Sequence, residues 1–174
     1  VTGKNLMKTN EMIEQLLGIL NRETELYQAM STVLNKEKEA AIQSELIALN
    51  EAEIEKENIL VALGSLEGQR RNLVTRLADT LGYSARDINL TQISQMVAEP
   101  FSGRLKRAKS ELSALLEAVQ AANQRNKKLF EHSRELLRGS FNLLSELRAP
   151  NPIYYRTGAI INTSASGKCV CDEI

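Results

Sequence analysis

The side chains that most often carry out chemistry are few in this sequence. It has one histidine, His132, and two cysteines, Cys169 and Cys171, among 174 residues. A di-iron site in a helical bundle needs two Glu-x-x-His motifs, and a zinc site usually needs four ligands, so neither can be built from this set. A Cys–His nucleophile pair would have to join the end of the chain to the middle of a helix. We therefore expect no catalytic residue, no metal site and no cofactor, and thus no enzyme.

The charge of the chain excludes further classes of protein. Lysine plus arginine and aspartate plus glutamate number 22 each, so there is no net field to hold nucleic acid or an anionic membrane. No apolar run approaches the roughly 18 residues of a membrane span. The first residues also lack the apolar centre of a secretion signal. We expect a cytoplasmic protein that neither binds nucleic acid nor inserts into a membrane.

Two asparagines interrupt an otherwise apolar pattern in the last long helical segment. Asn123 and Asn126 lie one turn apart on the face that the pattern predicts to be buried. A buried asparagine can fix the register of packed helices at some cost in stability. Alternatively, the pair supports a binding site where helices meet. The residues alone leave both interpretations open.

The elements that position these residues are predicted to be long helices. The sequence is rich in Leu, Ala, Glu, Lys, Arg and Gln, which favour helix. Apolar residues at steps of three, four and seven predict a first helix over about 6–34, through Ile13, Leu16, Leu20, Tyr27, Met30 and Leu34. A second helix is predicted over about 44–81, through Leu46, Leu49, Leu60, Leu63, Val74, Leu77 and Leu81.

The second helix has a weak middle and a clear end. Its residues 51–58 offer only Ala52 and Ile54 to a core, so this part is predicted to pack loosely or to project beyond the core. Gly82 fits a helix stop. The sequence Ser84-Ala-Arg-Asp87 predicts the start of a short helix that ends near Ala98.

The last helix shows the strongest pattern, six heptads kept in register from Leu105. Its apolar positions predict left-handed helix packing over roughly 70 Å, at about 1.5 Å per residue. The a positions are Leu105, Leu112, Val119, Asn126, Ser133, Ser140 and Leu147, the d positions are Ala108, Leu115, Ala122, Leu129, Leu136 and Leu143, and the e positions are Leu116, Asn123, Phe130, Leu137 and Leu144. The predicted fold is all-α, an elongated antiparallel coiled-coil helical bundle over residues 1–148, with three long helices and one short helix.

Beyond Arg148 the character of the sequence changes. Pro150 and Pro152 end the helix, and residues 149–174 contain no heptad. We expect a C-terminal tail that is flexible or bound to a partner. Its apolar residues normally find a surface to cover them, which makes them candidate binding residues: Ile153, Tyr154, Tyr155, Ile160 and Ile161.

The order of these parts resembles the FlgN family of flagellar export chaperones. The resemblance rests on the first helix with "RETELYQAM" at 22–30 and the second with "EIEKENILVALGSLEGQRRNLVTRLADTLG" at 53–82. It also rests on an Asn-x-x-Asn-x-x-Leu pattern in the last helix, formed by Asn123, Asn126 and Leu129. A tail that carries Tyr154, Tyr155 and Gly158 fits as well. The doubled tyrosine and the cysteines at 169 and 171 depart from the family pattern.

The resemblance implies a non-catalytic cytoplasmic chaperone. Such a protein would bind hook–filament junction (hook-associated) proteins, prevent their premature assembly and deliver them to the flagellar type III export gate. It also implies that the C-terminal region binds the client and that a tail tyrosine docks to the gate, either Tyr154 or Tyr155. The alternative is a non-catalytic structural coiled-coil adaptor or tether, although a simple spacer has no need for the apolar residues of the tail. The long apolar faces would also permit a homodimer.

Overall fold

A computed structural model of the protein describes residues 2–83 and 89–148, and all regular structure in these residues is helical. The helices are α1 (Thr2–Gln43), α2 (Leu46–Leu81), α3 (Leu90–Met96) and α4 (Phe101–Arg148). The predicted all-α helical bundle with three long helices and one short helix is therefore confirmed. The cysteines and the five candidate tail residues, Ile153, Tyr154, Tyr155, Ile160 and Ile161, lie outside the described residues.

The chain divides into two compact units. The first comprises residues 1–128 and holds α1, α2, α3 and the first part of α4. The second comprises residues 129–174, of which the last turns of α4 are described.

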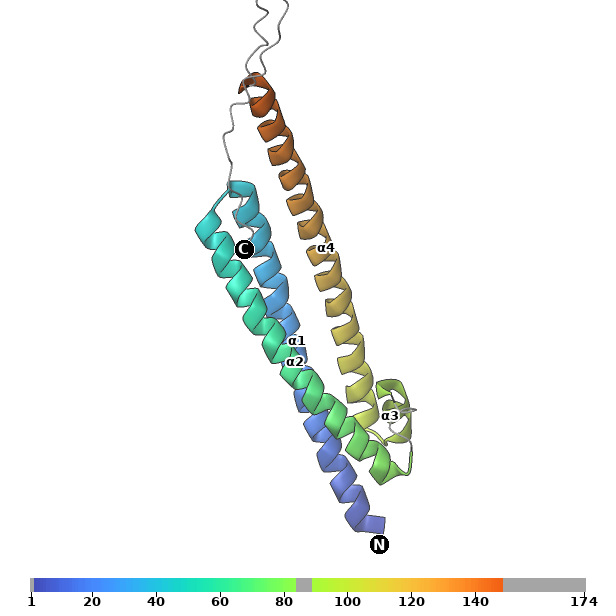
Figure 1. Ribbon diagram of the computed structural model, residues 1–174. Helices are drawn as coiled ribbons and strands as arrows, with labels where there is room; N and C mark the ends of the chain where they lie inside the picture. Colours follow the sequence, from blue (N-terminus) through green and yellow to red (C-terminus); the bar gives the residue numbers. More distant parts are fainter. Residues whose placement is uncertain (1, 84–88, 149–174) are drawn as a thin grey trace, which may run out of the picture. The chain divides into compact units, whose positions relative to one another are not determined.

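In the first unit, α1 and α2 form a long antiparallel hairpin (Figure 1). The chain leaves α1 through Ser44, which adopts a left-handed conformation with φ of 59°, and the amide of Glu45 donates to the carbonyl of Ala40 at 2.9 Å. Helix α2 ends in the same way. Gly82 has φ of 78°, and the amide of Tyr83 donates to the carbonyl of Ala78 at 3.0 Å. The predicted stop at Gly82 is confirmed, whereas α1 is longer than predicted at both ends.

The short helix α3 begins at Leu90. Asn89 caps it, because its Oδ1 accepts from the amide of Gln92 at 3.0 Å, and Gln92 Oε1 accepts from the amide of Asn89 at 2.8 Å. Such a reciprocal pair is a capping box, and it fixes the first turn. The predicted start at 84–87 lies outside the described residues. The helix ends at Met96 rather than near Ala98.

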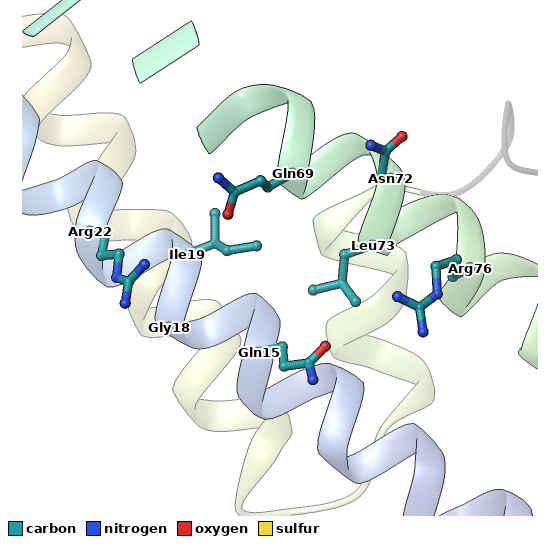
Figure 2. Close-up of a pocket in the computed structure, with 8 residues that line it drawn as sticks. All are labelled: Gln15, Gly18, Ile19, Arg22, Gln69, Asn72, Leu73 and Arg76. Carbon is teal, nitrogen blue, oxygen red and sulfur yellow. The ribbon is translucent and has the colours of Figure 1, made fainter. Parts of the chain in front are cut away.

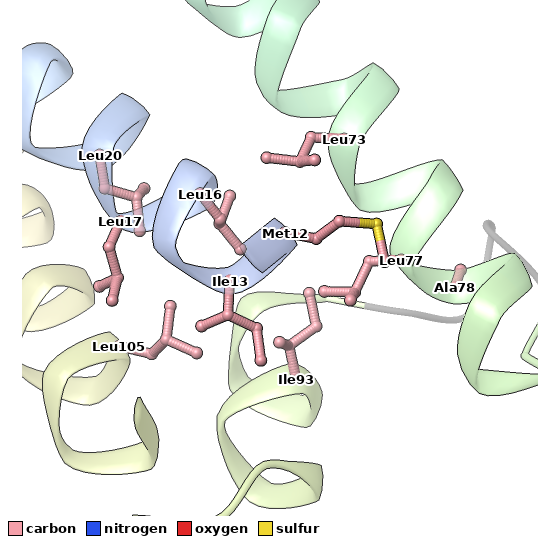
Figure 3. Packing of buried hydrophobic residues seen from close by; sticks show 10 residues of the cluster. All are labelled: Met12, Ile13, Leu16, Leu17, Leu20, Leu73, Leu77, Ala78, Ile93 and Leu105. Carbon is pink, nitrogen blue, oxygen red and sulfur yellow. The ribbon is translucent and has the colours of Figure 1, made fainter. Parts of the chain in front are cut away.

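All four helices contribute to one core cluster in the first unit, which Figure 3 shows. Side chains from α1 converge with those of α2, α3 and α4, and seven members of the cluster are 1% exposed or less. Burying a side chain of this kind stabilises a fold by roughly 1.5–3 kcal/mol. The cluster consists of Met12, Ile13, Leu16, Leu17, Leu20, Leu73, Leu77, Ala78, Ile93 and Leu105.

A second core cluster involves only the three long helices. Its members come from α1, α2 and α4 and lie closer to the α1–α2 turn along the hairpin. They are Met30, Val33, Leu34, Ala52, Ile59, Val119 and Ala122. The apolar row predicted for the first helix is confirmed, with Tyr27 half-buried at its edge.

The buried face of α2 agrees with the predicted row in part, since Leu77 is buried and Leu63, Val74 and Leu81 pack against the core clusters. Its core row is Ala52, Ile59, Leu66 and Leu73, each seven residues after the last. Leu46 and Leu60, which were placed in the apolar row, are exposed, and so is Ile54, which was expected to reach a core. Helix α2 has apolar residues on more than one side, so periodicity alone does not say which side packs against α1 and α4.

Candidate functional site

In the second unit, the last turns of α4 carry a broad exposed apolar stripe. Steps of three, four and seven residues place its members on one side of the helix. Each is between 56% and 75% exposed, although all are large apolar side chains. We call this set the α4 stripe: Leu136, Leu137, Phe141, Leu143, Leu144 and Leu147.

Two serine hydroxyl groups on the side of α4 that carries the stripe, one just before it and one within it, are satisfied by the helix itself. Ser133 Oγ donates to the carbonyl of Leu129 at 3.0 Å, and Ser140 Oγ donates to the carbonyl of Leu136 at the same distance. Because the serines already have acceptors, they need none from a partner. The stripe can therefore be covered by apolar side chains without leaving a buried polar group unpaired.

The heptad pattern of α4 thus has two structural outcomes. In the first unit, its a and d positions reach the core, as Leu105, Val119 and Ala122 show. From Leu136 to Leu147, within the second unit, the corresponding positions are exposed. The pattern predicted a helix with an apolar face, but it does not say what covers that face.

Asn126 connects all three long helices of the first unit. Its Nδ2 donates to the carbonyl of Leu34 and to Glu37 Oε2, both at 2.7 Å, and Lys56 Nζ donates to Glu37 Oε1 at 2.5 Å. Asn126 is 3% exposed and Glu37 is 2% exposed. A polar contact of this kind fixes the register of α4 against the hairpin, which supports the structural interpretation of this asparagine.

The prediction that Asn123 lies on the buried face is wrong. Its side chain is exposed, whereas Asn126, one turn further, is buried. Asn123 occupies an e position at the edge of the apolar face, and such edges stay open to solvent where only a and d positions pack. Leu129, the third residue of the Asn-x-x-Asn-x-x-Leu pattern, is half-buried in the second unit.

The contacts of Glu37 favour its charged form. Burial acts to raise the pKa of Glu37, but hydrogen bonds from Lys56 and Asn126 and the charge of Lys56 outweigh it, so the pKa lies below its ordinary value of 4.5. The pKa of Lys56 is raised in turn, because its contacts with Glu37 and Glu53 outweigh its own desolvation. The group is therefore an ion pair at neutral pH.

A second buried carboxyl group, Glu23, behaves in the opposite way. Burial raises the pKa of Glu23 above its ordinary value, and the nearby charge of Arg70, whose Nε lies 3.2 Å from Glu23 Oε1, compensates only in part. Arg70 is shared with Glu67 of the same helix. Burial, followed by the charge of Glu23, also raises the pKa of Tyr27.

These groups line a cavity of about 330 Å³ between α1, α2 and α4. The rest of its wall is Leu63, Gly64, Leu112 and Leu116, so the cavity places an ion pair and a phenol among apolar side chains. The sequence interpretation missed both buried glutamates. The available signal was their position, because Leu20, Glu23 and Tyr27 continue the apolar spacing of α1.

A more open groove of about 430 Å³ lies between α1 and α2 (Figure 2). Arg22 stands at one end and Arg76 at the other, with Ile19 and Leu73 between them. Its remaining lining is Gln15, Gly18, Gln69 and Asn72. These amide and guanidinium groups can bind a polar surface, but they include no general base or nucleophile.

Neither a metal site nor a membrane span is found in the described residues. Within 2–83 and 89–148, no three side chains of His, Cys, Asp or Glu are grouped so that they could hold a metal ion. No helix in these ranges is both long and apolar enough to cross a bilayer. His132 is exposed on α4.

Comparison with protein-family models identifies a relationship. The family model for FlgN protein matches residues 7–160, whereas no curated protein and no solved structure matches the sequence. The matched segment contains nearly all of α1, the whole of the other three helices, and the Asn-x-x-Asn-x-x-Leu pattern. The chain therefore belongs to the FlgN family of flagellar export chaperones.

Proposed function

We propose that this chain is a non-catalytic cytoplasmic chaperone that binds hook–filament junction proteins, the hook-associated proteins. It holds them before secretion, prevents their premature assembly and delivers them to the type III export gate. Family membership supports a role in flagellar export in general. The identity of the clients, the delivery to the gate and the cytoplasmic location are proposed here in addition to that general role.

The observation that carries the proposal is the α4 stripe. Six large apolar side chains between Leu136 and Leu147 are each more than half exposed on one side of the helix. An amphipathic helix of a client can pack against such a stripe, and the contact covers apolar surface on both partners. A client helix that is covered in this way cannot assemble with other subunits until it is released.

The tail and the family pattern extend the proposed binding region. We assign client or gate contacts to the apolar tail residues, Ile153, Tyr154, Tyr155, Ile160 and Ile161. On the helix, the pattern residues have separate parts: Asn126 fixes the register of α4, while the exposed amide of Asn123 and the side chain of Leu129 are offered to a partner.

The double variant Leu136→Ser with Leu143→Ser tests this assignment. We expect its affinity for a purified hook–filament junction protein to fall at least about tenfold, because two apolar anchors are lost from the contact. The free energy of unfolding should change by less than about 0.5 kcal/mol per site, since both side chains are exposed. Isothermal titration calorimetry and urea unfolding measure the two quantities.

A matched control comes from α2, where Ile54→Ser with Val61→Ser removes two equally exposed apolar side chains. This control should bind the client as the unchanged protein does.

Deletion of residues 149–174 should also weaken client binding, while the circular dichroism of the helices should stay unchanged. Full client affinity in the α4 variant would contradict the assignment of α4. Full affinity in the deletion variant would remove the tail from the binding region.

A further inference from the structure

Helix α2 carries a second apolar stripe, on the face directed away from the core. Ile47, Ile54 and Val61 are 79%, 53% and 71% exposed. Ile54 follows the buried Ala52 by two residues, and Val61 follows the buried Ile59 by two, which corresponds to about 200° around the helix. We call Ile47, Ile54 and Val61 the α2 stripe.

The α2 stripe has the spacing of a helix-packing surface. Its members are seven residues apart, so they align along one side of α2 over two heptads. The same spacing continues to Gly68, where an added Cβ would meet nothing within 4 Å. Single exposed apolar residues are common, but an aligned row of β-branched side chains on a solvent face indicates a contact surface.

Acidic side chains flank the α2 stripe on both sides. Glu51 lies three residues before Ile54 and Glu57 three residues after it, and both are exposed. Among the described residues, neither forms an ion pair, whereas the neighbouring acids do: Glu53 pairs with Lys56 at 2.6 Å and Glu55 with Lys36 at 2.7 Å. The two unpaired carboxylates lie about one turn to either side of Ile54, where basic side chains of a helix packed on the row can pair with them.

These charges decide which occupant fits the surface. A second copy of the chain would bring Glu51 and Glu57 against the same two acids, and like charges across a helix pair are unfavourable. An anionic membrane is repelled for the same reason. A helix with apolar residues every three or four positions and lysine or arginine beside them covers the row and pairs both carboxylates.

We propose that the outer face of α2 docks a basic amphipathic helix of a partner protein. This surface is separate from the α4 stripe and goes beyond the client binding assigned to it. The protein would then present two docking faces on different helices, one apolar and broad, the other narrow and bordered by acids.

The probe for this site is a synthetic 21-residue helical peptide with leucine at heptad positions a and d and lysine at e and g. Its counterpart has glutamate in place of each lysine. Fluorescence anisotropy against the full chain should show the basic peptide binding at least about tenfold more tightly than the acidic one. Its affinity should fall as salt rises, because exposed charges are screened.

Three variants locate the contact. Ile54→Ser with Val61→Ser should lower the affinity for the basic peptide at least about tenfold. Glu51→Lys with Glu57→Lys should make the protein prefer the acidic peptide. Leu136→Ser with Leu143→Ser should leave the preference for the basic over the acidic peptide unchanged. Because the α2 variants should still bind the client, failure of the α2 docking proposal is distinguishable from failure of the proposed function.

Several results would overturn the proposal. Equal affinity for the two peptides would show that the acidic border selects nothing. If the α4 variant lost binding of the basic peptide while the α2 variant kept it, the contact would lie on α4. A dimer of the unchanged protein in analytical ultracentrifugation that the α2 variant abolishes would identify a second copy as the occupant.

Discussion

Two glutamates of α1 occupy positions in its buried row, and their surroundings give them opposite properties. Glu23 is 4% exposed and Glu37 is 2% exposed, so neither has much contact with water. Glu37 accepts hydrogen bonds from Lys56 and Asn126, which favour its charged form. Glu23 shares Arg70 with Glu67, and burial dominates. The number of donors at each carboxylate, rather than burial itself, separates the two residues.

The pKa shifts of these residues predict opposite pH dependence of stability. The folded-state pKa of Glu37 lies below 4.5, so its stabilisation is present above pH 4.5 and is lost as the pH falls through the folded-state value. The folded-state pKa of Glu23 lies above 4.5, so stability is lost as the pH rises from 4.5 through that value. Urea unfolding between about pH 3 and pH 7 measures both effects.

Neutral variants isolate the two contributions. At pH 7, Glu37→Gln should lower the free energy of unfolding by about 1–3 kcal/mol, because a charged acceptor with two donors is lost. This difference from the unchanged protein should shrink below pH 4.5, where the carboxyl group of Glu37 takes up a proton. Glu23→Gln should compare most favourably with the unchanged protein at pH 7. If both variants showed the same sign of pH dependence, the contrast between the two sites would be wrong.

The two ends of the hairpin helices show how backbone conformation fixes an element. Both Ser44 and Gly82 have positive φ, and both allow the next amide to reach back to a carbonyl of the last helical turn. Only glycine adopts this conformation without a steric cost from Cβ. The end of α2 therefore depends on the identity of residue 82 more than the end of α1 depends on residue 44.

Two glycine substitutions in or beside α2 should have opposite effects. Gly82→Ala should lower the free energy of unfolding by about 1–2 kcal/mol, because alanine must take the left-handed conformation. Gly68→Ala lies inside the helix, where the added Cβ meets nothing within 4 Å, and should raise it by about 0.5–1 kcal/mol. Urea unfolding compares both with the unchanged protein. A neutral Gly82→Ala would show that the helix does not end through a left-handed residue in solution.

The sequence predicted the helices well because their periodicity is a property of each helix alone. The apolar row of α1 and the stop at Gly82 were found in this way. The buried face of α2 was found only in part, because Leu60 and Ile59 are adjacent apolar residues and only the packing of α1 and α4 decides which is covered. Periodicity predicts that a face is apolar, whereas burial depends on what lies opposite.

The candidate site was predictable only in part for the same reason. Asn126 was singled out correctly as a polar residue on a buried face, but its acceptors come from α1, far along the chain. The buried glutamates were missed because a charged residue is normally assigned to solvent. The exposure of the α4 stripe could not be inferred from the sequence, since a heptad pattern is equally compatible with a buried face and with an exposed face.

At the scale of the whole molecule, both core clusters lie entirely within residues 1–128. The polar contact of Asn126 with α1 also lies in this unit. The packed core and the main apolar surface of the proposed client contact therefore lie in different parts of the chain. The first unit supplies the packed core, and the second supplies the α4 stripe that the proposed function requires.

Truncation after Lys128 tests this division. The shortened chain should keep a cooperative urea transition, with a free energy of unfolding within about 1 kcal/mol of the full chain, because no residue of either core cluster is removed. It should lose client binding with the α4 stripe. Truncation after Ala118 is the matched control, since it also removes Val119, Ala122 and Asn126 from the second cluster and its polar contact. That cut should cost at least about 3 kcal/mol. If the chain ending at Lys128 were as unstable as the shorter one, residues beyond 128 would belong to the folding unit.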